Sequence, residues 1–273
     1  MKSDSPWLLW PREHGAWGMV SMPFLSAFVV ADALPWQFVP SMVAVAALFL
    51  ARAPLIVVGR QWLVWKDRHE ETSLAVRSLW VEAAAMALSG LLLGPRWGWA
   101  MLTSFGAIAL AFTFLAAWMT VRNRQREVWF QIVGAAGLSA SALAGSLTAL
   151  GQIAPWGWWL WAMHTAHATA GVLTVHARIE AKIAARTGKK ETAEQLLRQA
   201  LMAQLFLVAG CAWLAMQGKW LLAAAFAVSW ITGFGTLAQL RGGRALDTPL
   251  TKVGLRALAV SMLFSAAVIA GLR

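Results

Sequence analysis

The sequence predicts an all-α membrane protein in which nine transmembrane helices form one domain over residues 1–273. Only 13% of the residues are charged and 59% are hydrophobic, whereas soluble domains carry about 25% charged residues. Nine apolar stretches of about 20 residues follow one another, the length that a helix needs to cross a bilayer core. Lysine and arginine lie almost entirely in alternate connections between these stretches, which is typical of a multi-pass protein.

Each apolar stretch is expected to be a helix, because an open strand in lipid would leave its backbone groups without hydrogen bonds. Proline or glycine marks most of the short breaks between stretches, and two longer breaks are expected at 59–78 and 178–198. The predicted spans are 16–34, 37–58, 79–95, 98–121, 128–150, 156–177, 199–217, 220–240 and 253–271.

The distribution of basic residues predicts the orientation of the chain. Twenty of the 23 lysines and arginines lie in the N-terminal tail, in the second, fourth, sixth and eighth connections, or at the adjoining helix ends. By the positive-inside rule these segments face the cytoplasm, so nine spans place the C-terminus outside. Residues 1–15 lack the apolar core of a secretory signal and are expected to form a short cytoplasmic tail. We therefore predict a multi-pass protein of the cell's inner (plasma) membrane.

The net charge of +11 is interpreted as topology and contact with lipid. Nucleic-acid binding is not expected, because it would need a soluble basic face. Several of the 18 tryptophans stand at the ends of spans, where an amphipathic ring suits the headgroup region. Membrane lipids are therefore the expected partners, and the sequence leaves the oligomeric state open.

Charged side chains inside spans are costly and usually functional. Arg52 has apolar neighbours on both sides, which favours a functional role, whereas Glu82 lies where its side chain can also reach the interface. Arg60 and Glu127 stand at the ends of spans, and Asp32 lies near the far end of the first span. Because all of these except Asp32 fall in the cytoplasmic half, we expect a polar cavity that opens to the cytoplasm.

The sixth span has a polar stripe on one face. At 100° per residue, His164, His167, Thr174, Arg178 and Lys182 lie within about 80° of one another. Histidine and basic residues in this arrangement favour a site that holds an anion at its mouth. For each histidine by itself, a buried and hydrogen-bonded structural role is an equal alternative.

Three ionisable residues precede the first span in "WPREHGAWG". We expect Glu13 and His14 to turn inward and close the mouth of the cavity. The alternative for Glu13 is simple stabilisation of the helix N-terminus, where a carboxylate gains from the helix dipole.

The second connection carries Asp67, Glu70 and Glu71, whose oxygens are ligands that suit Mg²⁺. Basic residues interleave them, so a solvated helix end is the favoured interpretation, and no metal or other cofactor is expected.

The stretches "PREHGAWGMVSMPF" and "LARAPL", together with His164 and Arg178, resemble the YwiC-like family of bacterial membrane proteins. More distantly, the chain is similar to the UbiA prenyltransferase superfamily, which implies a nine-helix bundle around a cytoplasm-facing cavity. That superfamily has aspartate-rich motifs after spans 2 and 6, where this chain reads "RAPLIVVGRQWLVWKDRHEE" and "HARIEAKIAARTGKK". The resemblance therefore implies the fold, and the magnesium-dependent mechanism does not carry over.

The favoured function is a metal-independent, UbiA-like enzyme that binds a hydrophobic or isoprenoid-like substrate with an anionic head group. The candidate catalytic residues are Glu13, His14, His164 and His167, and the candidate substrate-binding residues are Arg52, Arg60, Glu127, Arg178 and Lys182. A small-molecule transporter is the main alternative, because intramembrane ionisable residues also mark substrate or proton paths. Haem binding through His164 and His167 is a further alternative.

Overall fold

The structure is a computed structural model that describes residues 8–9, 14–67, 69–188, 191–241 and 249–273. These residues form ten α-helices and one π-helical turn, and no strand occurs among them. The elements are α1 (His14–Ala31), α2 (Phe38–Arg60), η1 (Gln61–Trp65), α3 (Glu71–Trp97), α4 (Trp99–Val121), α5 (Val128–Ser139), α6 (Ser141–Leu150), α7 (Pro155–Thr187), α8 (Glu191–Met216), α9 (Trp220–Arg241) and α10 (Leu250–Leu272).

Each predicted span contains helix, which confirms the all-α prediction for the part of the chain that is described. Seven helical segments are long and apolar enough to cross a membrane. The apolar part of α1, Gly15–Ala31, is shorter, and α7, with 33 residues, is the longest helix.

The two longer breaks in the apolar pattern, at 59–78 and 178–198, are mostly helical. The second helix continues through η1 to Trp65, and α3 begins at Glu71. In the same way, α7 continues to Thr187 and α8 begins at Glu191. Glutamate, lysine, arginine and glutamine are good helix formers, so the helices continue after the hydropathy falls.

The fifth span consists of two consecutive helices, α5 and α6, with Ala140 between them. The Ala140 N–H is shared between the carbonyl oxygens of Ala136, at 3.0 Å, and Gly137, at 3.2 Å. The sequence predicted one span over 128–150, and Val128–Leu150 is long and apolar enough to cross a membrane as one segment.

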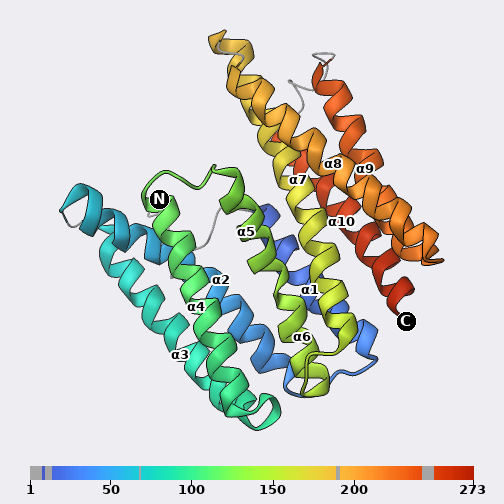
Figure 1. The fold of residues 1–273 in the computed structure, drawn as a ribbon. Coiled ribbons are helices and arrows are strands. Elements are labelled where there is room, and N and C mark those ends of the chain that lie inside the picture. The colour runs from blue at the N-terminus through green and yellow to red at the C-terminus, as the bar shows by residue number, and fades with distance from the viewer. Residues whose placement is uncertain (1–7, 10–13, 68, 189–190, 242–248) are drawn as a thin grey trace.

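The helices form two groups with a central set between them (Figure 1). In one group, α2 packs against α3 and α4, and in the other, α7, α8, α9 and α10 pack in succession. The central helices connect the groups, because α1 packs against both α6 and α10, and α5 packs against α7. In Figure 1, the α4–α5 connection and the adjoining ends of α7 and α8 lie toward the top, and the α3–α4 and α6–α7 connections lie toward the bottom.

Small residues allow α6 to approach α1 closely. The Ser141 hydroxyl donates a hydrogen bond of 2.7 Å to the carbonyl oxygen of Val20. A Cβ added at Gly145 would lie 2.6 Å from the Ala27 Cβ and 2.9 Å from the Phe24 carbonyl oxygen. Backbones in such close contact are typical of membrane helix packing.

Several of the tryptophans at helix ends are exposed on the surface of the helix bundle. Trp36, Trp62 and Trp220 are between 63% and 77% exposed. Trp97 differs, because it is only 9% exposed and its ring contacts Phe105 edge-on. Trp97 therefore belongs to the packing core between α3 and α4.

Candidate functional site

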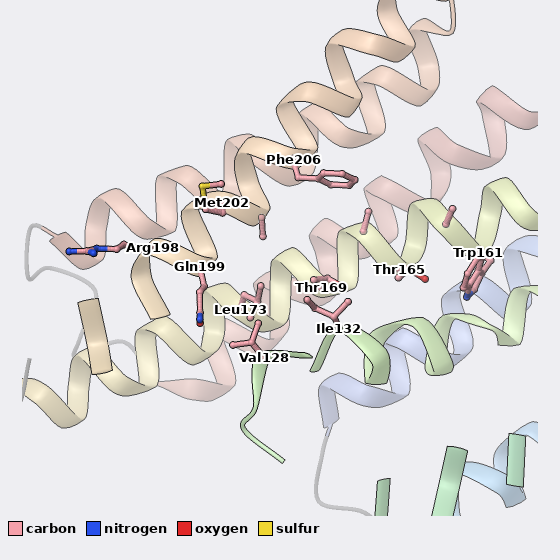
Figure 2. Close-up of a pocket in the computed structure, with 13 residues that line it drawn as sticks. Val128, Ile132, Trp161, Thr165, Thr169, Leu173, Arg198, Gln199, Met202 and Phe206 are labelled. Atoms are coloured by element: carbon pink, nitrogen blue, oxygen red, sulfur yellow. The ribbon is translucent and has the colours of Figure 1, made fainter. Parts of the chain in front are cut away.

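A cavity of about 680 Å³ lies between α5, α7 and α8. Figure 2 shows it as a groove with α5 on one side, α8 on the other and α7 along its floor. Apolar side chains line most of it, among them Ile132, Trp161, Leu173, Met202 and Phe206. A long apolar chain would therefore find hydrocarbon and aromatic contacts along the length of the groove.

Three of the residues that line the groove carry a side-chain polar atom that is buried behind the lining and has no hydrogen-bond partner among the described residues. These atoms are the hydroxyl oxygens of Thr165 and Thr169 and the side-chain carbonyl oxygen of Gln199. Most threonines of this protein donate to the carbonyl oxygen one turn earlier, as Thr113 and Thr174 do. The hydroxyl groups of Thr165 and Thr169, two residues that line the groove, make no such hydrogen bond among the described residues.

One end of the groove is cationic. Arg198 lines that end and Trp161 lines the other (Figure 2). The Arg198 side chain is exposed, and no carboxylate of the described residues forms an ion pair with it. An anion at this end would therefore meet an uncompensated guanidinium.

Polar side chains also connect α5 to α7 beside this cationic end. The Gln131 amide contacts the His176 imidazole at 2.7 Å, one turn after Leu173 of the groove. Arg126 and Glu180 form an ion pair of 3.1 Å between their Nη1 and Oε1 atoms. The groove thus passes from a polar end to an apolar interior.

His164 and His167, which the sequence predicted as catalytic, lie in a packed contact between α7, α9 and α10. The Nδ1 atom of His164 lies 2.9 Å from the Leu160 carbonyl oxygen, and its Nε2 atom lies 3.2 Å from the Ser265 hydroxyl. The two ring nitrogens of His167 contact the hydroxyl groups of Ser229, at 2.8 Å, and Ser261, at 2.9 Å. All four ring nitrogens thus have a protein partner.

The ring of Phe264 packs against both histidines. It stacks on His167 with a centroid distance of 4.3 Å and meets His164 edge-on at 5.2 Å. This arrangement is the buried, hydrogen-bonded role that was the alternative for each histidine. A catalytic role for them stays a prediction.

The predicted substrate-binding cations are spread over several helices. The Nη2 atom of Arg52 donates a hydrogen bond of 3.3 Å to the Thr120 hydroxyl of α4. Arg178 is only 6% exposed, whereas Lys182, one turn later, is exposed. Arg60 is half-buried in the last turn of α2.

The groove lies on the opposite face of α7 from the predicted polar stripe. At 100° per residue, Thr169 is about 140° from His164 and about 180° from Arg178. The structure therefore does not bring His164, His167 or Arg178 into the groove, which none of them lines. In the sequence, the only feature that marks this face of α7 is the pair Thr165 and Thr169, four residues apart. Threonine is common in membrane helices, so the pair did not indicate a groove.

Glu127 lies outside the groove, immediately before α5. Its carboxylate accepts hydrogen bonds from the Arg124 guanidinium and, at 2.6 Å, from the Trp129 indole. These two hydrogen bonds lower the pKa of the Glu127 carboxyl below its ordinary value. Its contacts are therefore local to the start of α5.

The other predicted carboxylates occupy different environments. Glu82 is 3% exposed, and its Oε2 atom has no hydrogen-bond partner among the described residues. Asp32 forms an exposed ion pair of 3.1 Å with Arg273. Asp67, Glu70 and Glu71 are exposed. Within the described part of the chain, no three His, Cys, Asp or Glu side chains converge on a common point.

The prediction that Glu13 and His14 close the mouth of the cavity falls on side chains outside the described residues. Glu13 and the side chain of His14 lie outside the described residues, and only the backbone of His14 is described, as the first residue of α1.

Comparison with known proteins agrees with the resemblance seen in the sequence. The model of a protein family described as YwiC-like protein matches residues 10–146, half of the chain. The search of curated proteins returned no match. The search of solved structures returned none either. The matched region begins with the "PREHGAW" stretch and ends within α6, and on this basis the chain belongs to the YwiC-like family.

Proposed function

We propose that this protein is a multi-pass protein of the bacterial inner membrane, with its N-terminus in the cytoplasm, that binds an amphipathic molecule in the groove between α5, α7 and α8. The molecule has a long apolar chain, of hydrophobic or isoprenoid-like kind, and an anionic head group. The observation that supports this most strongly is an apolar groove with an arginine at one end that pairs with no carboxylate of the described residues.

The apolar part of the ligand is assigned from the lining. Trp161, Met202 and Phe206 present aromatic rings and a thioether to the groove, and such side chains adapt to flexible apolar chains. The volume of about 680 Å³ lies within the range of about 300–1,000 Å³ for small-molecule sites. The groove therefore suits one chain better than a bulky lipid with two.

The anionic head group is assigned from charge. Arg198 lines the end of the groove, and within the described ranges it has no carboxylate partner. A guanidinium binds phosphate or carboxylate through two parallel hydrogen bonds. Such binding uses no metal ion.

The experiment measures binding of radiolabelled geranylgeranyl diphosphate to the purified protein in detergent, with EDTA present. We expect saturable binding, and about a tenfold weaker affinity for Arg198→Gln, because a hydrogen-bonded charge pair is lost. Arg186→Gln is the matched control, since Arg186 is exposed at the end of α7 and does not line the groove. Absence of saturable binding, or equal losses in both variants, would contradict the proposal.

Transport is the second candidate, because Glu82 and Arg178 are ionisable residues buried inside the helix bundle, and such residues also mark substrate or proton paths. Counterflow of the same labelled ligand in proteoliposomes would distinguish transport from binding or turnover. The predicted enzyme activity depends on residues of the opposite face of α7 and on Glu13 and His14. Product formation in the same vesicles tests it.

A further inference from the structure

We infer that the ligand of the groove is an anionic lipid of the cytoplasmic leaflet, which enters sideways from the bilayer and places one chain in the groove and its head group at Arg198. This inference rests on the proposed function and narrows its ligand from any anionic amphiphile to a lipid that stays in the membrane. It comes from the side on which the groove is open, from its depth and from the position of its arginine.

The groove is open on a surface that faces the bilayer. Two of the three helices that form it belong to segments long and apolar enough to cross a membrane, Val128–Leu150 and Glu191–Met216. On these helices the lining residues Met202 and Phe206 are 66% and 67% exposed, and Ile132 is 42% exposed. Large apolar side chains exposed on membrane-spanning helices contact lipid chains, which are as apolar as they are. A lipid can therefore reach the groove without crossing water.

The groove has about the depth of one leaflet. Leu173 lies near its cationic end and Trp161 lies at the other (Figure 2). These two residues are twelve positions apart on α7, which corresponds to about 18 Å of helix. Half of a hydrocarbon core of about 30 Å is about 15 Å. A chain that begins at the cationic end would thus reach the middle of the bilayer and end close to Trp161, as the chain of an ordinary membrane lipid does.

Arg198 lies where the head group of such a lipid would be. It is exposed at the cationic end of the groove, and no carboxylate of the described residues forms an ion pair with it. The orientation proposed from the basic residues puts this end of α8 at the cytoplasmic surface. A basic residue near that surface attracts anionic lipids, and a guanidinium can bind a lipid phosphate through two hydrogen bonds. The groove therefore fits a lipid of the cytoplasmic leaflet in the orientation that it has in the bilayer.

The test places a fluorescent label in the groove and measures its quenching by lipids brominated in the acyl chain. The label is attached to Met202→Cys in a Cys211→Ala background, which removes the only native thiol, and the protein is reconstituted into vesicles. Brominated phosphatidylglycerol has an anionic head group, and brominated phosphatidylcholine has the same chains without a net charge. The matched control is Phe114→Cys on α4, because Phe114 is exposed like Met202 and does not line the groove.

We expect both lipids to quench the label at Met202→Cys, because the groove is open to the bilayer. Phosphatidylglycerol should bind about fivefold more tightly there than phosphatidylcholine, which corresponds to the roughly 1 kcal/mol that one basic residue near the surface contributes. The label at Phe114→Cys should be quenched equally by the two lipids. Geranylgeranyl diphosphate should relieve the quenching at Met202→Cys only, since it competes for the same groove.

Variants of Arg198 identify the contact with the head group. Arg198→Gln should remove the preference for phosphatidylglycerol, and Arg198→Lys should keep part of it, because an ammonium group keeps the charge and lacks the planar fork. Arg186→Gln is the matched control and should keep the whole preference, since Arg186 is exposed at the end of α7 outside the groove. Equal losses in Arg198→Gln and Arg186→Gln would show a general attraction of anionic lipid to the basic surface and would overturn the inference.

The outcomes separate this inference from the proposed function. Quenching at Phe114→Cys without quenching at Met202→Cys would overturn the inference, because the groove would then be covered, for example by a second copy of the chain. Equal quenching by the two lipids at Met202→Cys would overturn it as well. In either case, saturable binding of geranylgeranyl diphosphate in detergent would still support the proposed function, and its absence would contradict that function itself.

Discussion

The indole of Trp161 donates a hydrogen bond of 2.9 Å to the carbonyl oxygen of Ala136, one turn before α5 ends. Trp161 lies on α7 and also lines the groove between α5, α7 and α8. The Trp161 side chain therefore connects the apolar end of the groove to α5.

Replacing Trp161 with phenylalanine should weaken both the packing of α7 against α5 and the binding of ligand in the groove. The variant loses the indole N–H, so we expect the free energy of unfolding to fall by about 0.5–1.5 kcal/mol, together with weaker ligand binding. Thermal unfolding in detergent measures the first effect. Trp220→Phe is the control, because Trp220 is 70% exposed. If the two variants are equally stable, the contact with Ala136 contributes nothing to stability.

The close approach of α6 to α1 predicts that Gly145 does not tolerate a methyl group. In Gly145→Ala, the new Cβ would meet the Phe24 carbonyl oxygen, which is backbone and cannot move aside. We expect a loss of about 1–3 kcal/mol in the free energy of unfolding. Gly106→Ala should be neutral or stabilising by up to about 1 kcal/mol, because its Cβ would meet no atom within 4 Å. Similar melting temperatures for the two variants would contradict the packing between α6 and α1.

The contacts of Glu127 predict a pH-dependent contribution to stability. Hydrogen bonds from Arg124 and Trp129 lower its pKa in the folded protein, whereas the unfolded value is about 4.3. The stabilisation is therefore present above that pH and is lost as the pH falls through the folded pKa. The difference in melting temperature between the native protein and Glu127→Gln should be largest near neutral pH and disappear in acid. A difference that does not change with pH would show that the carboxylate charge is irrelevant.

The orientation inferred from the basic residues is tested by cysteine labelling. Gln152 in the α6–α7 connection and Arg122 after α4 are both exposed, and Cys211→Ala removes the only native thiol. A membrane-impermeant maleimide should label Gln152→Cys in spheroplasts and Arg122→Cys only after permeabilisation. Labelling of both from the same side would exclude the proposed threading.

The sequence by itself determined the all-α fold class and the approximate position of every apolar helix. Lipid provides no hydrogen bonds, so a long apolar stretch has to be helical whatever it packs against. Sequence motifs also determined the family, since "PREHGAW" lies at the start of the region matched by the family model. The limits of helices outside the apolar stretches were less predictable, because charged residues such as Glu71 and Arg186 favour helix as well as solvent.

Only the tertiary structure decided which face of α7 meets an open groove. His164 and Arg178 formed the more conspicuous polar stripe in the sequence, but His164 packs against Ser265 and Phe264 of α10. Thr165 and Thr169 lie on the other side of α7, where no helix in the described part of the chain hydrogen-bonds to their hydroxyl groups. Whether a polar side chain finds a partner depends on residues far away in the chain, and periodicity along one helix contains no information about them.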